Sequence, residues 1–458
     1  MQKVTAVFDI GKTNKKFFLF DFNFKEVYRE YTKFDEIVDE DGFPCENLLA
    51  LHTWLKEVFD RILKAESYDI IAINFSSYGA SLVHIDVNGN VLTPLYNYTK
   101  PMDQSVLDDF NQKYGLGREF TKRTGCVSEG MLNSGMQIYW LKKTKPEIYS
   151  KIKYSLHLPQ YISYIFTGIP LSEYTSIGCH TGLWDYQKKD YHDWVYEERI
   201  NEILAPVVST ETSINMKYNG KPIKIGVGVH DSSAALLLYI RSVKKKFILV
   251  STGTWSIALN PFVKSNLSDS DIDNECINYM RLDGSAVKAS RLFLGNEYKL
   301  QVQFLLNRYK VAENYHKSVK FNHAIFEEIS FDFKPMFIWK SLKNISPLSL
   351  STMSHYTFEK AYHQLMLELV LLQVESIKTT IGENKIHRIY IDGGFSDNDL
   401  YVSLLSHYLR GMKIHTTDSS LGSALGAALC ISDLKLNSKF MKETYSLKKH
   451  VPFISKIN

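Results

Sequence analysis

Cysteine is scarce in this chain of 458 residues, and its spacing excludes two classes of protein. The five cysteines lie far apart, form no C-x-x-C pair and are odd in number. Neither a disulfide framework nor a zinc site is therefore predicted, and a reducing compartment, the cytoplasm, is expected. The five positions are Cys45, Cys126, Cys179, Cys276 and Cys430.

Long hydrophobic runs and an excess of charge are also absent from the sequence. The most apolar helical stretch, Ala234 to Ile240, is far shorter than the roughly 20 residues that cross a bilayer, and residues 1 to 10 lack the pattern of a secretory signal. The net charge is only +4, and the basic residues form no patch interleaved with aromatics. No membrane span and no nucleic-acid partner are predicted.

What the sequence does contain is enough apolar material for two domains. Hydrophobic residues make up 45% and charged residues 23%, which is typical of globular proteins. A chain of this length exceeds the size of one ordinary hydrophobic core. Two lobes are expected, divided into residues 1–240 and 241–458.

Two similar hairpins stand half a chain apart. Val4 to Ile10 is a β-branched run that breaks at Gly11 and resumes at Lys16 to Phe20. Phe247 to Val250 is followed by the turn Ser251-Thr252-Gly253-Thr254 and a second strand from Trp255. A duplicated architecture is predicted from this pair.

The remaining pattern indicates an α/β protein. Asp69 to Ser76 reads as a strand, and Phe358 to Thr380 reads as a long amphipathic helix. The strand Ile386 to Ile391 follows, then the pair Gly393-Gly394 and a helix from Asn398. Strand, glycine pair and helix in this order are typical of α/β folds.

The first turn carries an acid and small polar residues. Gly11-Lys12-Thr13 is not a P-loop, because Ala6 replaces the required earlier glycine and a strand follows. Asp9, at the end of its strand, is a candidate magnesium-linked acid, and the turn could bind phosphate through backbone N–H groups and hydroxyls. The alternative is an Asp and a Gly that only shape a tight turn.

The second turn, Thr252 to Thr254, offers the same hydroxyls and close backbone approach, and its alternative is an ordinary hairpin turn. The pair Gly393-Gly394 could let a flat base or ribose slide against the backbone. A close contact between helix and strand explains the same two glycines equally well.

Asp231 is the candidate catalytic base. It lies in Gly226 to Ser233, after a strand and before an apolar helix expected to begin at Ala234. The alternative role is helix N-capping, which would compete with proton transfer for the same carboxylate. Gly226-Val227-Gly228 also suggests a nicotinamide-dependent oxidoreductase. The sequence lacks the third glycine of the dinucleotide-binding fingerprint, which argues against that class.

Taken together, the motifs resemble the FGGY family of carbohydrate kinases, in particular its L-fuculokinase and L-rhamnulokinase branch. The resemblance runs almost end to end. In order, the segments that carry it are DIGKTN, NSGMQIYWLKKTKPEIY, LPQYISYIFTG, GVGVHDSSAA, STGTWSI and DGGFSDN. It implies an actin-like ATPase (ribonuclease H-like) fold with two lobes around a central cleft, and ATP with magnesium as phosphoryl donor.

The resemblance also implies roles for individual residues. Asp231 matches the general base and Asp9 the magnesium-linked acid. The phosphate and adenosine positions are Thr13, Asn14, Thr252, Gly253, Thr254, Gly393, Gly394 and Asn398, and the sugar positions are Tyr78, Gly79, His230 and Asp231.

Two positions depart from the family pattern. Family members commonly carry an acid and an arginine where this chain has only Lys100, so the sugar is left open. Whether Asn296 serves as the asparagine near the nucleotide is also open. The predicted activity is ATP-dependent phosphorylation of a small ketose of the L-fuculose or L-rhamnulose type. The alternatives are a xylulose- or ribulose-type kinase and a non-catalytic sugar sensor. A homodimer stays open.

Overall fold

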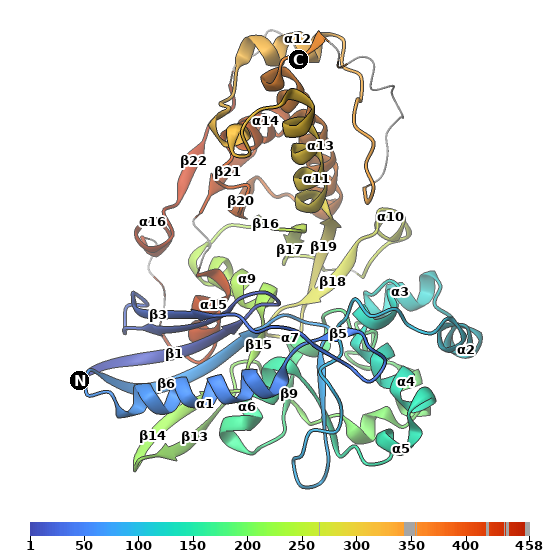
Figure 1. The fold of residues 1–458 in the computed structure, drawn as a ribbon, viewed down its shortest axis with the longest axis vertical. Helices are drawn as coiled ribbons and strands as arrows, with labels where there is room; N and C mark the ends of the chain where they lie inside the picture. The colour runs from blue at the N-terminus through green and yellow to red at the C-terminus, as the bar shows by residue number, and fades with distance from the viewer. Residues whose placement is uncertain are drawn as a thin grey trace.

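The computed structural model describes residues 1–264, 266–342, 353, 355–417, 421–434, 436 and 439–453. Two large sheets, each of seven strands, dominate it (Figure 1). The first sheet belongs to the N-terminal half and the second to the C-terminal half. Among the described residues, no helix combines the length and the apolar character that crossing a membrane requires.

The first sheet is built around β1, whose two neighbours are β2 and β6. A short strand, β15 (Val229–His230), pairs with the end of β6. The strand order is β13 (Ser213–Tyr218), β14 (Lys221–Gly226), β6 (Tyr68–Ser77), β1 (Gln2–Ile10), β2 (Lys15–Phe20) and β3 (Glu26–Thr32).

The second sheet repeats this design around β16. The strand order is β18 (Ile277–Met280), β19 (Ala286–Leu292), β17 (Ser256–Asn260), β16 (Ile248–Thr252), β20 (Arg388–Gly393), β21 (Lys413–Thr416) and β22 (Lys448–His450).

Six strands of each sheet match in order and in direction. Both sheets contain a hairpin of antiparallel strands, β1–β2 in the first and β16–β17 in the second. A third antiparallel strand, β3 or β19, pairs with the second strand of the hairpin. On the other side come two parallel neighbours and a last antiparallel strand. The duplicated architecture predicted from the two hairpins is therefore confirmed.

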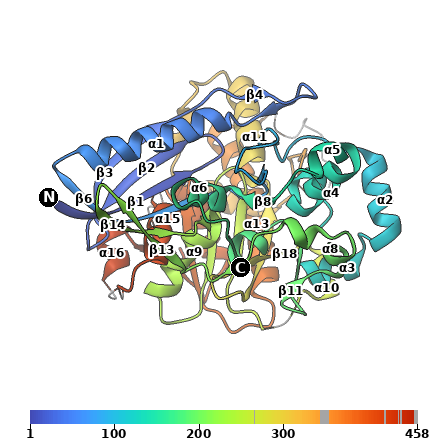
Figure 2. The same cartoon turned by 90° about the horizontal axis from the view of Figure 1, so that it is seen from below.

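The first sheet carries helices on both faces. Helices α1 (Leu48–Lys64) and α6 (Leu158–Thr167) pack on one face, where strand β1 contributes Phe8. The opposite residue, Val7, faces helices α9 (Asp231–Ser242) and α15 (Gly422–Cys430). This alternation follows from the two-residue period of a strand. Figure 2 shows α1 lying along the sheet.

Helices α9 and α15 lie between the two sheets (Figure 1). They share one apolar cluster with Val7 of β1 and Leu249 of β16. Gly426 permits this crossing, because a Cβ there would lie 1.9 Å from the carbonyl oxygen of Ala234. Residues from both ends of the chain thus build the joint between the lobes.

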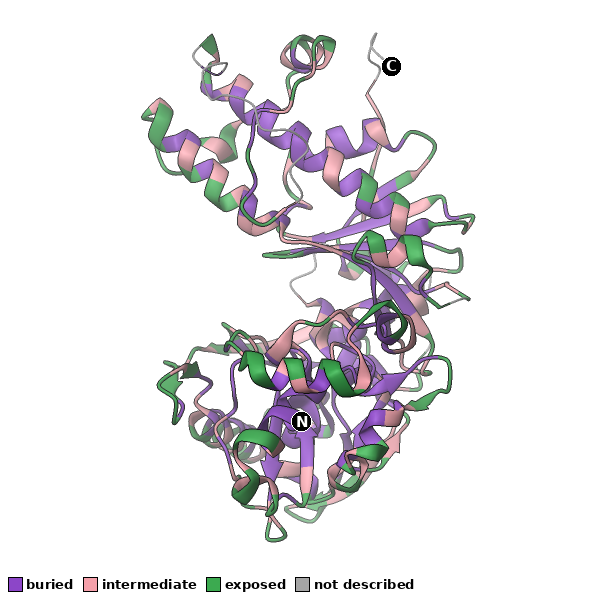
Figure 3. Ribbon diagram, turned by 90° about the vertical axis from the view of Figure 1, so that its right-hand side faces the viewer, coloured by how far each residue is buried: buried purple, intermediate pink, exposed green. Residues whose placement is uncertain are grey.

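The far face of the second sheet is covered by helices α11 (Leu294–Tyr309), α13 (Phe358–Ile381) and α14 (Asp399–Tyr408). Helix α13 is buried on every side from Ala361 to Val370, and Figure 3 shows the buried residues of the whole chain in purple. The predicted helix from Phe358 and strand before Gly393 are confirmed. The division at residue 240 stays a prediction, since α15 packs on β1 and β6 of the first sheet.

The remaining elements are short. The other helices are α2 (Gln104–Tyr114), α3 (Arg118–Thr124), α4 (Ser134–Thr144), α5 (Pro146–Tyr149), α7 (Tyr174–Ile177), α8 (Asp193–Glu197), α10 (Asp269–Asp273), α12 (His323–Phe331) and α16 (Phe440–Thr444). The 3₁₀ turns with described bounds are η1 (Gly130–Leu132), η2 (Ile200–Ile203) and η3 (Tyr315–Ser318). The paired short strands are β4 (Ile37–Val38) with β5 (Pro44–Cys45), β7 (Leu82–Ile85) with β8 (Tyr154–His157), β9 (Ser172–Glu173) with β12 (Val207–Val208), and β10 (Trp184–Asp185) with β11 (Asp190–Tyr191).

Candidate active site

A cavity of about 900 Å³ brings together residues of both halves. Six of the residues predicted for the site line it: Thr13, Tyr78, Gly79, His230, Asp231 and Thr254. They come from the β1–β2 turn, the end of β6, the start of α9 and the β16–β17 turn. The volume is within the range of small-molecule sites.

Asp231 is the first residue of α9, so the expectation that the helix begins at Ala234 is wrong. The N-cap position belongs to His230, and no side-chain capping bond is made there. One carboxylate oxygen of Asp231 accepts the N–H of Ser232 at 2.5 Å and lies 3.6 Å from Nε2 of His230. The N-cap alternative is therefore wrong as well, and the side chain stays 34% exposed.

Gly79 lies against His230 for a steric reason. A Cβ at Gly79 would come within 2.8 Å of the Nε2 atom of His230, so only glycine permits this approach. The neighbouring Tyr78 donates its hydroxyl to Glu46 at 3.1 Å. Burial, followed by Glu46, raises the pKa of Tyr78 well above its usual value, which keeps the phenol protonated as a donor.

The β1–β2 turn presents its small polar residues to solvent. Gly11 donates its N–H to the carbonyl of Asn14 at 3.0 Å and closes the turn, which leaves Thr13 and Asn14 exposed. Thr13 lines the cavity. An exposed turn of this type can present its polar groups to an anion.

Asp9 lies just before this turn, at the end of β1. Its carboxylate accepts the hydroxyl of Ser423 at 2.8 Å and lies 3.6 Å from the ammonium of Lys16. Burial raises its pKa, while Lys16 and Ser423 oppose the shift, and the charge of Asp231 adds to it.

The donors present suit a magnesium ion that arrives with a nucleotide. Within the described ranges, no group of three or more His, Cys, Asp or Glu side chains could hold a metal. Magnesium commonly binds through one or two carboxylates, with water and substrate phosphates completing its shell. Asp9 supplies one such carboxylate.

The β16–β17 turn divides its two threonines between different tasks. Thr254 is exposed and lines the cavity. The hydroxyl of Thr252 is buried, donates to the carbonyl of Asp392 and accepts the N–H of Phe395 at 3.1 Å. Gly253 donates its N–H to the carbonyl of Trp255 at 2.7 Å. The side chain of Thr252 therefore holds two strand ends together.

The residues predicted for adenosine lie outside this cavity. A Cβ at Gly393 would lie 1.8 Å from the carbonyl oxygen of Thr252, so the close-contact explanation fits this glycine. Gly394 is exposed, with space around it. Asn398 caps α14, accepting the N–H of Tyr401 at 3.0 Å, and donates to Tyr362. Their adenosine role stays a prediction.

Helix α11 begins directly on the second turn. Asn296 donates its backbone N–H to the carbonyl of Thr254 at 3.2 Å. A Cβ at Gly295 would lie 1.9 Å from the carbonyl oxygen of Gly253, which makes this contact tight. Asn296 is thus a neighbour of the turn through its backbone.

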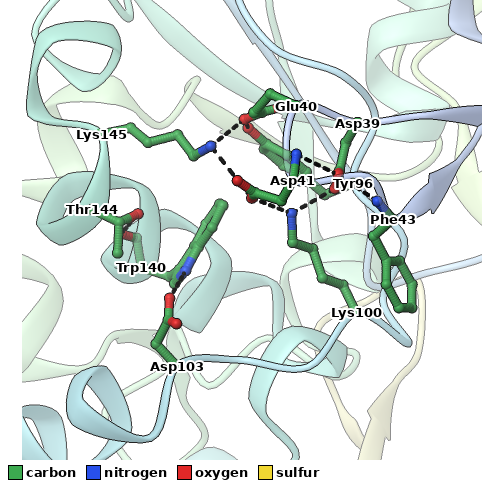
Figure 4. A network of polar contacts seen from close by, with 10 residues as sticks. All are labelled: Asp39, Glu40, Asp41, Phe43, Tyr96, Lys100, Asp103, Trp140, Thr144 and Lys145. Carbon is green, nitrogen blue, oxygen red and sulfur yellow. Dashed lines mark hydrogen bonds and ion pairs between the residues drawn. The ribbon is translucent and has the colours of Figure 1, made fainter.

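Lys100 lines the cavity, and its acids come from far upstream. Its ammonium lies 2.5 Å from Asp39 and 2.6 Å from Asp41 (Figure 4). Burial lowers the pKa of Lys100, but the hydrogen bonds to the two carboxylates outweigh burial and raise it. Lys100 is therefore paired with two acids of the segment that joins β4 and β5.

We call residues 36–46, which include β4 and β5, the acidic hairpin. It carries Glu36, Asp39, Glu40, Asp41 and Glu46, and all five bind lysines. Glu40 also accepts the hydroxyl of Tyr96, which Figure 4 shows next to the ion pairs.

Sequence reasoning missed the residues that join the two lobes across the cavity. Arg291 of β19 lies 2.8 Å from Glu129, which precedes η1. His180 lies 3.0 Å from the hydroxyl of Tyr279 of β18. Burial, together with Arg291 and His230, lowers the pKa of His180 well below its usual value, so the imidazole is neutral. No motif marks these pairs, because their members lie 162 and 99 residues apart.

Family models match most of the chain. Residues 4–232 match the N-terminal domain of the FGGY family of carbohydrate kinases, and residues 244–439 match its C-terminal domain. The chain belongs to the FGGY family of carbohydrate kinases.

Individual relatives are distant. A rhamnulokinase of Halalkalibacterium halodurans is 24% identical over 264 residues, which cover 54% of each chain. The L-fuculokinase of Escherichia coli strain K12 is 22% identical over 280 residues, 56% of each chain. The chain spans about half the length of the curated relatives it matches.

Solved structures establish the fold. A carbohydrate kinase from Novosphingobium aromaticivorans has a TM-score of 0.80 at 22% identity, covering 98% of this chain and 94% of the other. A xylulose kinase from Lactobacillus acidophilus reaches 0.79 at 16% identity, with the same coverage. The predicted actin-like ATPase fold, with two lobes of ribonuclease H type, is confirmed.

Proposed function

We propose that this protein transfers the γ-phosphoryl group of ATP to a hydroxyl of a small ketose of the L-fuculose or L-rhamnulose type. The observation that carries the proposal is the carboxylate of Asp231, partly exposed in a cavity that both polar turns enter. Family membership and the named relatives, rhamnulokinases and L-fuculokinases, support this substrate class.

In the proposed reaction, Asp231 accepts the proton of the attacking sugar hydroxyl. The hydroxyl oxygen forms a new bond to the γ-phosphorus, and the bond from that phosphorus to the β,γ-bridging oxygen breaks. ADP leaves with the electron pair of the broken bond. General-base assistance contributes about 10² to 10⁴ in rate, and positioning and charge stabilisation supply most of the rest.

The chain's polar groups are assigned to the two ends of the substrate pair. Tyr78, Gly79 and His230 contact the sugar, and the turns of Thr13 and Thr254 contact the phosphates. Asp9 would hold a magnesium ion through water, and the bound ion would neutralise charge on the phosphates. We assign adenosine to the exposed surface at Gly394 and the neighbouring Asn398.

Other features of the protein stay proposals of the same kind. The five cysteines are all free and buried, which supports a reducing compartment such as the cytoplasm. Assembly into a homodimer is a further proposal, and the sequence does not decide it.

The test is a set of kinase assays with L-fuculose, L-rhamnulose, xylulose or ribulose as the acceptor. ATP and magnesium are present in each assay, and ADP release is measured. We expect turnover with one of the first two ketoses. The Asp231→Asn variant should lose about 10² to 10⁴ in turnover, while its thermal unfolding stays unchanged because the amide oxygen can still accept the N–H of Ser232. Near-normal turnover of this variant would remove the assignment of the base.

A xylulose- or ribulose-type kinase is the second candidate, and the observation that favours it is the structural likeness to a xylulose kinase. The same panel separates the candidates by the preferred sugar. If no sugar released ADP while calorimetry still detected sugar binding, a non-catalytic sugar sensor would replace the kinase.

A further inference from the structure

Three cationic side chains line the cavity among the described residues: Lys12, Lys100 and Arg291. Lys100 is held by two carboxylates at 2.5 and 2.6 Å and is only 7% exposed (Figure 4). Arg291 is paired with Glu129 at 2.8 Å, and its side chain is 10% exposed. Both cations are nearly buried themselves, and each is held by a carboxylate within 2.8 Å.

Lys12 is held differently. Its ammonium lies 3.0 Å from Glu36 and 3.9 Å from Glu46. Its side chain is 26% exposed and that of Glu36 is 47% exposed. An ion pair with this exposure contributes little to stability, so an incoming group with more than one negative charge can displace Glu36.

The backbone of Lys12, in contrast, is fixed. The ammonium of Lys15 donates to the carbonyl of Lys12 at 3.0 Å. Lys15 is itself paired with Glu46 at 2.5 Å, and both of these side chains are buried. The turn therefore presents a flexible four-carbon stem from a rigid base, next to Thr13 and in the same cavity as Asp231.

We propose that the Lys12 ammonium leaves Glu36 when a nucleoside triphosphate binds, and that it then contacts an oxygen of the γ-phosphoryl group. This makes Lys12 a further catalytic residue, and the inference rests on the proposed kinase function. The ammonium takes no part in proton transfer. It stabilises negative charge on the phosphoryl group while the bond to the bridging oxygen breaks and the bond to the sugar oxygen forms.

Lysine suits this task although the P-loop geometry is absent. An ammonium on a flexible stem acts as a point charge with three donors, and it follows a group that moves between two oxygens. The acidic hairpin supplies its resting partner through Glu36. This arrangement keeps the cation near the turn before the nucleotide arrives.

The experiment compares Lys12→Met and Lys12→Arg with the unmodified chain. Calorimetric titrations with ATP, ADP and AMP, each with magnesium and at two salt concentrations, measure the contribution of the outer phosphates. We expect Lys12→Met to weaken ATP binding about tenfold or more, ADP binding less and AMP binding not at all. Turnover should fall about 10- to 100-fold, and Lys12→Arg should restore most of both.

Lys145→Met is the matched control. Lys145 also binds the acidic hairpin, at Glu40 and Asp41, but it does not line the cavity. Its loss should leave the difference between ATP and AMP binding unchanged. If Lys12→Met weakened all three nucleotides equally, or none of them, the proposal would be overturned.

Glu36→Gln provides a test that does not depend on removing Lys12. Without the carboxylate, the ammonium no longer exchanges one partner for another, so ATP binding should strengthen about two- to fivefold and AMP binding should not change. Weaker ATP binding in this variant would contradict the proposal. Thermal unfolding of each variant shows whether the turn remains folded.

The outcomes separate this inference from the kinase proposal. If the unmodified chain phosphorylates a sugar and Lys12→Met matches it in ATP binding and turnover, only the role of Lys12 fails. If no sugar is phosphorylated while the ATP-specific loss of affinity is observed, the kinase proposal fails and the phosphate contact stands.

Discussion

The two sheets carry the same pair of side chains at the same place, with the partners exchanged. In the first sheet, Asp9 on β1 pairs in register with Ser76 on β6. In the second sheet, Ser251 on β16 pairs with Asp392 on β20. Each sheet thus pairs one acid with one serine across its two central parallel strands. The acid lies on the hairpin strand β1 in the first sheet and on the neighbouring strand β20 in the second.

The surroundings give these acids different properties. Asp9 has a lysine 3.6 Å away, the cation of Lys16 on the neighbouring strand. The matching position on β17 is Ile257, which pairs with Ser251. Burial raises the pKa of Asp392 to about 6, and hydrogen bonds from Ser251 and Tyr239 only partly oppose it. Both acids are therefore buried and have raised pKa values, but Asp9 lies beside a cation, whereas the matching position in the second sheet is the apolar Ile257.

The largest expected effect breaks the second sheet at its end. Gly393 has φ +81° and no room for a Cβ, since Thr252 O would lie 1.8 Å away, whereas Gly394 has nothing within 4 Å. We expect Gly393→Ala to lower the free energy of unfolding by about 3–5 kcal/mol, and Gly394→Ala to change it by less than about 1 kcal/mol. Urea denaturation of both variants measures the difference.

The first sheet provides the control for this steric argument. Ser77 pairs with Ile10 as Gly393 pairs with Thr252, so a side chain is accommodated at the equivalent place. Ser77→Ala should cost only about 1 kcal/mol, the value of its hydrogen bond to the carbonyl of Tyr78. Equal losses for Gly393→Ala and Ser77→Ala would contradict the close-contact explanation.

The second prediction separates the two acids by activity. Asp9→Asn should lower turnover about a hundredfold, which corresponds to ~2.7 kcal/mol of barrier, because a neutral amide binds a metal–phosphate group poorly. Asp392→Asn should change turnover by less than about threefold. Steady-state kinetics at saturating ATP and sugar provide both numbers, and equal losses would show that the proposed difference between the acids is wrong.

The sequence predicted the fold well because its signals were local. The two hairpins, the strand before Gly393 and the long helix from Phe358 are read from short windows of apolar periodicity and turn residues. The start of α9 was missed by three residues, since Asp231 to Ser233 are polar and only the apolar run from Ala234 shows the helical pattern.

The site was predicted only where a motif marks it. Asp231, Thr13 and Thr254 lie in recognisable segments and do line the cavity. The pairing of Arg291 with Glu129 depends on how two lobes meet, which local spacing does not encode. Thr252 lies in a phosphate motif, but its hydroxyl is bound between two strands, so its phosphate role stays a prediction.

The third prediction concerns pH and the second sheet. The pKa of Asp392 is about 6 in the folded protein, whereas the usual pKa of an aspartate is 3.8. Folding therefore raises this pKa. Its contribution to stability is therefore fully present below about pH 4 and is lost as the pH rises through 6. Relative to the unmodified chain, Asp392→Asn should gain about 1–3 kcal/mol of unfolding free energy between pH 4 and pH 7. A difference that did not vary over this range would rule out the shift.

The smallest expected effect distinguishes two threonines of one turn. Thr252→Val keeps the side-chain volume but leaves the N–H of Phe395 without its hydroxyl acceptor, so the free energy of unfolding should fall by about 1–2 kcal/mol. Thr254 is exposed in the cavity, and Thr254→Val should leave unfolding unchanged while it raises the KM for ATP. Urea denaturation and ATP kinetics of the two variants form a crossed test. If Thr252→Val altered the KM for ATP without altering stability, its hydroxyl would face the nucleotide rather than strand β20, and the division of tasks within this turn would be reversed.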